Sequence, residues 1–144
     1  DITIITSSVN VLVEATRLPG ITLIVLGGEY SATSDSFHSY TSISDMENFN
    51  FDLAFLGTTG LSIDGGLTTA TFMEAAIKST AMRRAKETVV VADQSKFGIR
   101  STSKFANLSE ASTIVSDHAP SKEITAYCQN GGIQLITAEA DSML

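Results

Sequence analysis

Short apolar runs rich in β-branched residues recur along the chain and alternate with segments of different periodicity. Six of these runs predict strands: Ile2–Thr6, Ile21–Leu26, Phe51–Leu56, Thr88–Ala92, Ile114–Val115 and Ile133–Ile136. Continuous apolar runs, as opposed to alternating ones, are typical of strands that are buried on both sides. The pattern therefore favours a parallel sheet over an antiparallel one.

The segments between the runs predict helices. They are Val9–Arg17, His38–Phe49, a helix from Thr71 to at least Ala81, and Ser121–Gln129. Ser7 or Ser8 can cap the first helix, and Pro19 ends it. In the third helix Glu74 and Lys78 are spaced i,i+4, which places both on its polar side, opposite an apolar stripe that begins at Phe72.

Strands that alternate with helices in this way define an α/β fold, with a mainly parallel sheet covered by helices on both faces. The 144 residues suffice for one domain, which we expect to extend from residue 1 to residue 144. The chain begins at Asp1, directly before a strand, without an initiator Met or a signal-like segment. This start predicts a processed or excised domain of a longer protein whose N-terminal part lies upstream.

Composition narrows the class of protein. Hydrophobic residues make up 43% of the chain and charged residues 17%, which excludes a disordered chain, and no run of 18 apolar residues predicts a membrane span. The one cysteine, Cys128, excludes an internal disulfide and a cysteine-based zinc site. A free thiol fits a reducing compartment, so we expect the protein in the cytoplasm.

Charge is unevenly distributed along the chain. The net charge is −7, yet residues 78–104 carry seven basic residues and two acidic ones. A short cationic segment in an acidic protein suggests a small anionic ligand, because a nucleic-acid groove requires a broader basic face. The alternative is that Arg83, Arg84 and Lys86 form only the solvated C-terminal end of a helix, where cations interact favourably with the helix dipole.

Hydroxyl groups, glycines and one lysine follow the predicted strands. The candidate ligand-binding residues are Thr6, Ser7, Ser8, Gly27, Gly28, Thr58, Thr59, Gly60, Asp93 and Lys96, with Lys78 or Arg100 as a second cation. Ligands of parallel sheets bind beyond the carboxyl ends of the strands, where glycines allow close approach and hydroxyls and lysine donate to phosphate. Together these residues predict a pocket for a sugar phosphate. Taken singly, each is equally compatible with a turn or a helix cap.

The sequence offers little for metal, cofactor or nucleophilic chemistry. No G-x-G-x-x-G or P-loop motif is present, and His38, His118 and Cys128 have no metal-ligand spacing. We expect both histidines at the surface and Cys128 in the core. The predicted site contains no catalytic residue, no metal and no cofactor.

Six segments, in this order and spacing, resemble one family. They are Ile4–Ser8, Leu26–Gly28, Asp52–Gly57, Gly60–Ser62, Glu74–Lys78 and Ala92–Gly98. This series of six segments is similar to the C-terminal sensor domain of DeoR-family bacterial transcription regulators, and the similarity extends to about residue 137. The resemblance implies an upstream winged helix-turn-helix that contacts operator DNA, a homo-oligomeric repressor, and a phosphorylated sugar or sugar derivative as effector.

The DeoR family is also similar in fold to ribose-5-phosphate isomerase and related sugar-phosphate enzymes. That similarity implies that Lys96 contacts the phosphate. The isomerase places two catalytic aspartates where this chain has Gly57–Gly60, and its catalytic glutamate falls near Lys78. Binding without turnover is therefore the expected function. An isomerase- or deaminase-like enzyme and a purely oligomerising module are the alternatives. The sequence leaves open which sugar phosphate binds, which operon is regulated, and whether the effector induces or co-represses.

Overall fold

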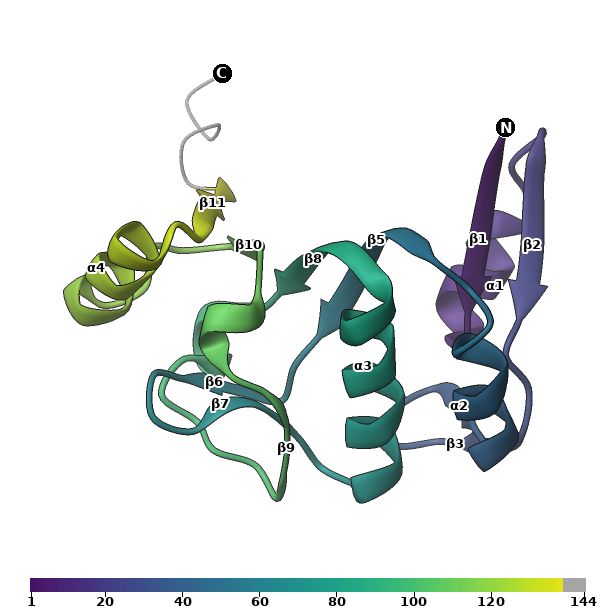
Figure 1. Ribbon diagram of the computed structural model, residues 1–144, viewed down its shortest axis with the longest axis horizontal. Helices are drawn as coiled ribbons and strands as arrows, with labels where there is room; N and C mark the ends of the chain where they lie inside the picture. Colours follow the sequence, from purple (N-terminus) through teal and green to yellow (C-terminus); the bar gives the residue numbers. More distant parts are fainter. Residues whose placement is uncertain (139–144) are drawn as a thin grey trace. The chain divides into compact units, whose positions relative to one another are not determined.

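The computed structural model describes residues 1–138 and divides into two compact units, residues 1–48 and a second unit that begins at Phe49. The first unit contains β1 (Ile2–Thr6), α1 (Val9–Ala15), β2 (Ile21–Val25), β3 (Glu29–Ser31), β4 (Ser36–His38) and α2 (Tyr40–Met46). β1 and β2 are parallel, and β3 and β4 form an antiparallel hairpin. Figure 1 shows α1 beside the β1–β2 pair.

In the first unit the two predicted strands and the first helix are confirmed, and the β3–β4 hairpin was not predicted. Ser8 caps α1 by accepting a hydrogen bond from the Val11 amide (3.4 Å). The helix predicted from His38 begins only at Tyr40, because His38 ends β4 and Ser39 caps α2. The hairpin strands are three residues long, too short for a detectable alternation.

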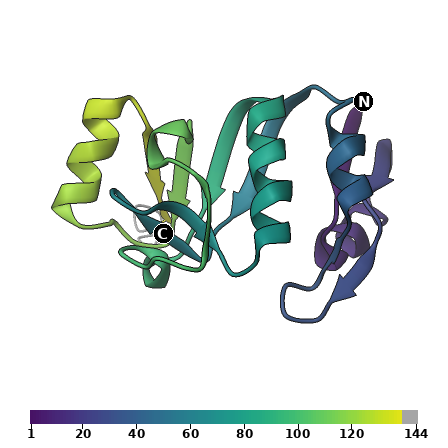
Figure 2. The ribbon, with the colours of Figure 1, turned by 60° about the horizontal axis from the view of Figure 1, so that its bottom comes forward.

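The second unit carries a larger sheet. Its elements are β5 (Phe51–Gly57), β6 (Gly60–Ser62), β7 (Gly66–Thr69), α3 (Phe72–Arg84), β8 (Ala85–Val91), the 3-10 turn η1 (Gln94–Lys96), β9 (Ser103–Ala106), the 3-10 turn η2 (Leu108–Glu110), β10 (Thr113–Ser116), α4 (Lys122–Gly131) and β11 (Gln134–Thr137). Four strands form a parallel sheet in the order β11–β10–β8–β5. This sheet and its helices confirm the predicted α/β class; α3 lies against β5 and β8, and α4 lies next to β11 (Figure 2).

A small antiparallel sheet, β6–β7–β9, was not predicted from the sequence. Its strands are short and rich in glycine, serine and threonine, so they carry no clear hydrophobic pattern. Gly66 allows β7 and β9 to pack closely in this sheet. It has φ of +72°, and a Cβ at this position would lie 2.3 Å from the Ala106 carbonyl oxygen, so only glycine lets β9 approach so closely.

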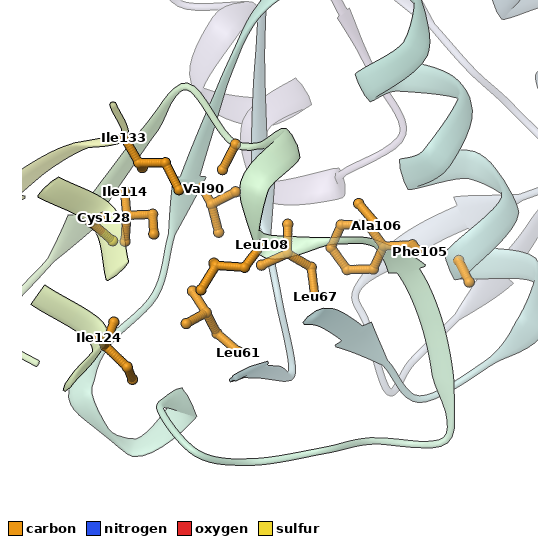
Figure 3. Close-up of a cluster of buried hydrophobic side chains, with 12 residues drawn as sticks. Leu61, Leu67, Val90, Phe105, Ala106, Leu108, Ile114, Ile124, Cys128 and Ile133 are labelled. Carbon is orange, nitrogen blue, oxygen red and sulfur yellow. The ribbon is translucent and has the colours of Figure 1, made fainter. Parts of the chain in front are cut away.

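The core of the second unit lies between the small sheet and one face of the parallel sheet (Figure 3). Its fully buried side chains are Leu61, Leu67, Val90, Ile114 and Cys128, each with 0% exposure. Cys128 is thus a core residue, as the sequence predicts. The opposite face of the sheet carries apolar side chains as well, and there Phe55 is 68% exposed.

Two expectations for α3 and its surroundings are wrong. Phe72 does not belong to a buried stripe: it is the first residue of the helix and is 75% exposed, whereas Ala75 and Thr80 are buried. Lys86 does not end the helix but lies on β8, where its ammonium pairs with Asp52 at 2.7 Å. Arg84 is in the last turn, as expected, and donates to the Phe49 carbonyl (2.9 Å).

Candidate functional site

The carboxyl ends of β5, β8 and β10 meet at one edge of the parallel sheet. Gly57, the last residue of β5, lies opposite Val91, the last residue of β8, and Val91 lies opposite Val115 of β10. The loops that follow these strands therefore emerge side by side. We call this region the sheet-edge site; it comprises Gly57–Gly60, Asp93–Lys96 and Asp117, together with Glu74 and Lys78 of α3.

Asp93 fixes the loop that follows β8. Its carboxylate caps η1 by accepting a hydrogen bond from the Ser95 amide (2.8 Å), and it also accepts one from the Ser95 hydroxyl. These hydrogen bonds hold the pKa of Asp93 below its usual value, and the nearby Lys96 ammonium acts in the same direction. The carboxylate is exposed and therefore accessible to a ligand.

Asp117 joins the loop after β10 to the loop after β8. One carboxylate oxygen accepts from the Gln94 amide (2.8 Å) and the His118 amide (2.9 Å), and the other lies 3.0 Å from His118 Nδ1. Desolvation alone would raise the pKa of Asp117, but the hydrogen bonds from His118, Gln94 and Ser116 outweigh it and lower the pKa. Sequence reasoning missed Asp117 because its partner Gln94 lies 23 residues away.

Lys96 ends η1 and presents a cation at the sheet edge. Its side chain is half-buried, and its ammonium forms no hydrogen bond or ion pair with any residue between 1 and 138. The Asp93 carboxylate is near enough to interact with this ammonium electrostatically, but the two groups form no ion pair. This is the arrangement expected where an anionic ligand supplies the missing interaction.

The loop from Gly57 to Gly60 is held rigidly. The Thr58 hydroxyl is buried and lies 2.7 Å from the Gly60 carbonyl oxygen and 3.0 Å from that of Thr68. A Cβ on Gly60 would lie 2.3 Å from the Ile99 carbonyl oxygen, so the loop packs directly on the segment that follows Lys96. Thr58 and Gly60 stabilise the backbone conformation of this loop, whereas the side chain of Thr59 is exposed.

Glu74 and Lys78 face the sheet edge from α3. The Lys78 ammonium donates to the Gly57 carbonyl (2.9 Å), and Glu74 accepts from the Thr69 hydroxyl (2.6 Å). Both side chains are half-buried, so the polar side of the helix on which their spacing places them is not fully solvated. Burial lowers the pKa of Lys78, and the carboxylate of Glu74 partly opposes this effect.

The predicted residues of the first unit gather at the carboxyl ends of β1 and β2. Thr6 Oγ1 accepts from the Ser8 amide (3.1 Å), and the Ser7 carbonyl accepts from the Phe37 amide of β4 (2.9 Å). The Ser8 hydroxyl is used in capping α1. The structure thus brings Thr6, Ser7 and Ser8 together and places them next to the unpredicted hairpin.

Of the two glycines after β2, Gly27 contacts α2 and Gly28 lies against the same hairpin. The Gly27 carbonyl accepts from the Ser42 hydroxyl (3.0 Å), and Gly28 has φ of +137° with a hypothetical Cβ only 2.3 Å from the His38 carbonyl oxygen. His38 itself is half-buried, with Nε2 2.9 Å from the Ser36 hydroxyl, so its predicted surface position is wrong. His118 is exposed, as expected.

A cavity of about 360 Å³ lies beside α3. It is lined by Ser79, Met82, Arg83, Phe105, Ala106 and Glu110. These residues belong to the last turns of α3 and to segments that precede β10. None of the predicted ligand residues lines this cavity, so it is distinct from the candidate site.

Two further features bear on the class of protein. Among residues 1–138 no three His, Cys, Asp or Glu side chains are grouped so that they could hold a metal ion. Within the same residues, no helix has the length and apolar character that crossing a bilayer requires.

The hydrogen bonds of Asp117 lead to a prediction on acid stability. Because its pKa is lowered in the folded chain, its contribution to stability is present above the unfolded value of 3.8 and is lost as the pH falls below it. We expect the melting temperature to drop between pH 5 and pH 3, and to drop less in Asp117→Asn. Calorimetry across this range measures both slopes. Equal slopes would show that Asp117 does not contribute to the acid sensitivity.

A parallel sheet with glycine-, hydroxyl- and lysine-bearing loops at its carboxyl edge defines a small-ligand-binding α/β domain. The family model described as DeoR C terminal sensor domain matches residues 1–118. The chain belongs to this family, which confirms the resemblance drawn from the sequence. The family is a regulatory sensor domain and not a family of enzymes.

Curated relatives carry the names of transcriptional regulators. The chain is 31% identical over 128 residues to the HTH-type transcriptional regulator IolR of Bacillus subtilis, covering 89% of this chain and 51% of the relative. It is 30% identical over 129 residues to the deoxyribose operon repressor of Escherichia coli, covering 90% and 51%. It is 27% identical over 141 residues to the HTH-type transcriptional repressor GlcR of Bacillus subtilis, covering 98% and 54%. The chain thus spans about half the length of these relatives.

Proposed function

We propose that this domain senses a phosphorylated sugar or sugar derivative and thereby controls DNA binding by a transcriptional repressor. The observation that carries the proposal is the ammonium of Lys96, half-buried at the carboxyl edge of a parallel sheet with no hydrogen-bond or ion-pair partner among residues 1–138. A phosphate group supplies the partner that this cation lacks.

The neighbouring groups suit the sugar part of such a ligand. In this proposal Lys96 pairs with the phosphate, while Asp93, Thr59 and Lys78 hydrogen-bond to hydroxyls of the sugar. Thr58 and Gly60 contribute through the backbone, because the Thr58 side chain is already bonded within the loop. Within the first unit, considered by itself, Thr6, Ser7, Ser8, Gly27 and Gly28 are proposed as ligand-binding residues.

The enzyme alternative is not supported. The relatives are named as regulators or repressors, and the family match is to a sensor domain. The purely oligomerising alternative predicts no small-molecule binding, so the ligand experiment described below distinguishes it from the proposal.

The proposal assigns DNA contact to another part of the protein. A net charge of −7 disfavours contact between this chain and the phosphate backbone of DNA. We propose that an upstream winged helix-turn-helix binds operator DNA, that the regulator is a cytoplasmic homo-oligomer, and that the effector favours one arrangement of its sensor domains.

A ligand panel tests the anion requirement. We expect glucose 6-phosphate, fructose 1-phosphate, ribose 5-phosphate or glycerol 3-phosphate to raise the melting temperature of the full-length protein, and the corresponding unphosphorylated compounds to have no effect at the same concentration. A charge-assisted hydrogen bond contributes about 1.5–3 kcal/mol, which is roughly ten- to a hundredfold in affinity. Thermal-shift measurements over a concentration series give the comparison.

Two results of this experiment would contradict the proposed function. If the unphosphorylated compounds stabilise the protein as strongly as their phosphates do, the Lys96 anion site is refuted. If no compound of either kind has an effect, the domain does not sense these sugar phosphates and the oligomerising alternative gains support.

A further inference from the structure

We infer that the cavity beside α3 is a second small-molecule site, which takes a neutral molecule with an aromatic ring and a hydroxyl group. The cavity has a volume of about 360 Å³ and is lined by Ser79, Met82, Arg83, Phe105, Ala106 and Glu110. All six residues lie outside the sheet-edge site. The inference therefore goes beyond the proposed function and concerns a different ligand.

The spacing of three residues on α3 builds one wall of the cavity. Ser79, Met82 and Arg83 are three and four positions apart, so they lie on one side of the helix. This side faces β9 and η2, which supply Phe105 and Glu110. The cavity thus lies between a helix and a segment that is distant from it in sequence.

An irregularity in the small sheet directs Phe105 to the cavity. Leu67 pairs with Ala106, and the next residue, Thr68, pairs with Lys104, so the pairing of β7 with β9 skips Phe105. A residue skipped in this way forms a β-bulge, which changes the direction of a side chain and is over-represented next to active sites. The ring of Phe105 is thereby placed in the cavity wall.

The two walls are fixed by contacts on their far sides. Phe105 and Ala106 belong to the buried core, with 6% and 7% exposure (Figure 3). The Lys78 ammonium lies 5.5 Å from the centre of the Phe105 ring, within cation–π distance. At the end of α3, Arg84 donates to the side-chain oxygen of Asn50 (2.6 Å). Neither wall can move into the cavity without disturbing these contacts, so the cavity is preformed.

The volume of the cavity admits one substituted ring. Protein interiors leave few voids larger than a water molecule, whereas pockets for small molecules range from about 300 to about 1,000 Å³. An apolar cavity of about 150 Å³ already holds benzene. The cavity beside α3 therefore has room for a benzene-sized ring and a short polar substituent.

The apolar part of the lining suits an aromatic ring. Phe105 contributes a ring, Met82 a thioether and Ala106 a methyl group. Contacts between two rings, and between sulfur and a ring, are favourable beyond the apolar area that they bury. An aromatic ligand gains both kinds of contact here.

Two polar groups of the lining can bind a hydroxyl group. Glu110 Oε2 accepts from the Asn107 amide (2.6 Å), and its other oxygen forms no hydrogen bond with any residue that the structure describes. The Ser79 hydroxyl bonds to none of residues 1–138 either, unlike that of Thr80, which donates to the Ala76 carbonyl (2.9 Å). A ligand hydroxyl can donate to the carboxylate and accept from the serine.

Charge distinguishes this cavity from the anion site proposed at Lys96. Arg83 and Glu110 carry opposite charges, so the lining as a whole has no net charge. An anionic ligand would be repelled by the Glu110 carboxylate at close range. A neutral ligand meets no such repulsion, which is why we assign a neutral molecule to the cavity.

Methyl NMR on the full-length protein, isotopically labelled at methionine and alanine, tests the inference. Met82 and Ala106 place two observable methyl groups in the cavity wall, and benzyl alcohol is the probe. We expect both signals to shift saturably in a titration to about 10 mM, which detects a Kd of about 1 mM. The Met46 signal should not shift, because Met46 is buried within the first unit and does not line the cavity.

Three variants show whether the probe occupies the cavity. Ser79→Leu fills part of it and removes the serine hydroxyl, so Kd should rise at least about tenfold. Ser109→Leu makes the same exchange at an exposed serine of η2 outside the lining and should change Kd less than about twofold. Glu110→Gln keeps an oxygen for the Asn107 amide but removes the charge, so Kd should rise roughly tenfold. Glu110→Gln also gives the test if Ser79→Leu does not fold.

Two related probes test the class of ligand. Toluene has the ring without the hydroxyl group, and benzoate has the ring with a negative charge. Both should bind the unmodified protein at least about threefold more weakly than benzyl alcohol does. Equal affinity for all three compounds would refute the assignment of a neutral hydroxyl-bearing ligand.

The inference and the proposed function can fail independently. If the Met82 and Ala106 signals do not shift, or shift without saturation, the second site is refuted while the Lys96 site stands. If Ser79→Leu and Glu110→Gln both bind benzyl alcohol as the unmodified protein does, the probe lies elsewhere and the inference is also refuted. Lys96→Ala should leave the Kd for benzyl alcohol unchanged, and a rise as large as that in Ser79→Leu would contradict a separate site.

Discussion

Replacing Lys96 by alanine in the full-length regulator is expected to abolish its response to sugar phosphate and to leave its operator affinity near the unmodified value when no effector is present. The response is lost because the substitution removes the charged donor to the phosphate. Such a hydrogen bond contributes about 1.5–3 kcal/mol of binding free energy, which is roughly ten- to a hundredfold in effector affinity. Operator affinity is spared because the Lys96 ammonium forms no hydrogen bond or ion pair with residues 1–138.

A mobility-shift titration with and without effector measures both quantities in one experiment. Lys122→Ala is the matched control, because Lys122 is an exposed lysine at the start of α4, outside the sheet-edge site. It should respond to effector as the unmodified protein does. If Lys96→Ala loses operator binding without effector, Lys96 has a structural or assembly role and the phosphate assignment is withdrawn.

Leu61→Ala is expected to destabilise the domain by about 2–5 kcal/mol, the range found for leucines removed from well-packed cores. The side chain is 0% exposed within the core cluster, and alanine would leave a cavity there. Leu61 also supports the site, because its carbonyl accepts from the Gly98 amide and it forms a bridge with Phe97, next to Lys96. Denaturant titration gives the free energy of unfolding.

Leu53→Ala is the matched control for Leu61→Ala. Leu53 lies on β5 and is 48% exposed, so the same change in side chain should cost less than about 1 kcal/mol. A loss at Leu61 no larger than the loss at Leu53 would contradict the placement of Leu61 in the core.

Much of the parallel sheet could be predicted from the sequence, because its signals are local. A mainly apolar run such as Phe51–Leu56 identifies a strand without knowledge of its neighbours, and the structure places β5 there. The burial predicted with it is wrong for Leu53 and Phe55, which are exposed. Helix caps are equally local, as Ser8 shows. The order of these segments carries the family resemblance, which the match over residues 1–118 confirms.

The small antiparallel sheet could not be predicted, because its stability comes from contacts distant in sequence. β7 pairs with β9 more than thirty residues later, and the glycine that permits this, Gly66, looks like a simple turn in the sequence. The burial of Thr58 has the same origin, since one of its hydrogen-bond partners is Thr68 on β7.

For the candidate site, the sequence by itself determined that hydroxyls, glycines and Lys96 follow the strands, because strand ends are set by local pattern. Spacing alone also placed Glu74 and Lys78 on one side of a helix. Only the tertiary structure decided that this side faces the sheet edge, where Lys78 reaches Gly57 and Glu74 reaches Thr69. The direction in which a helix turns its charged side depends on how the whole helix packs, which no local spacing specifies.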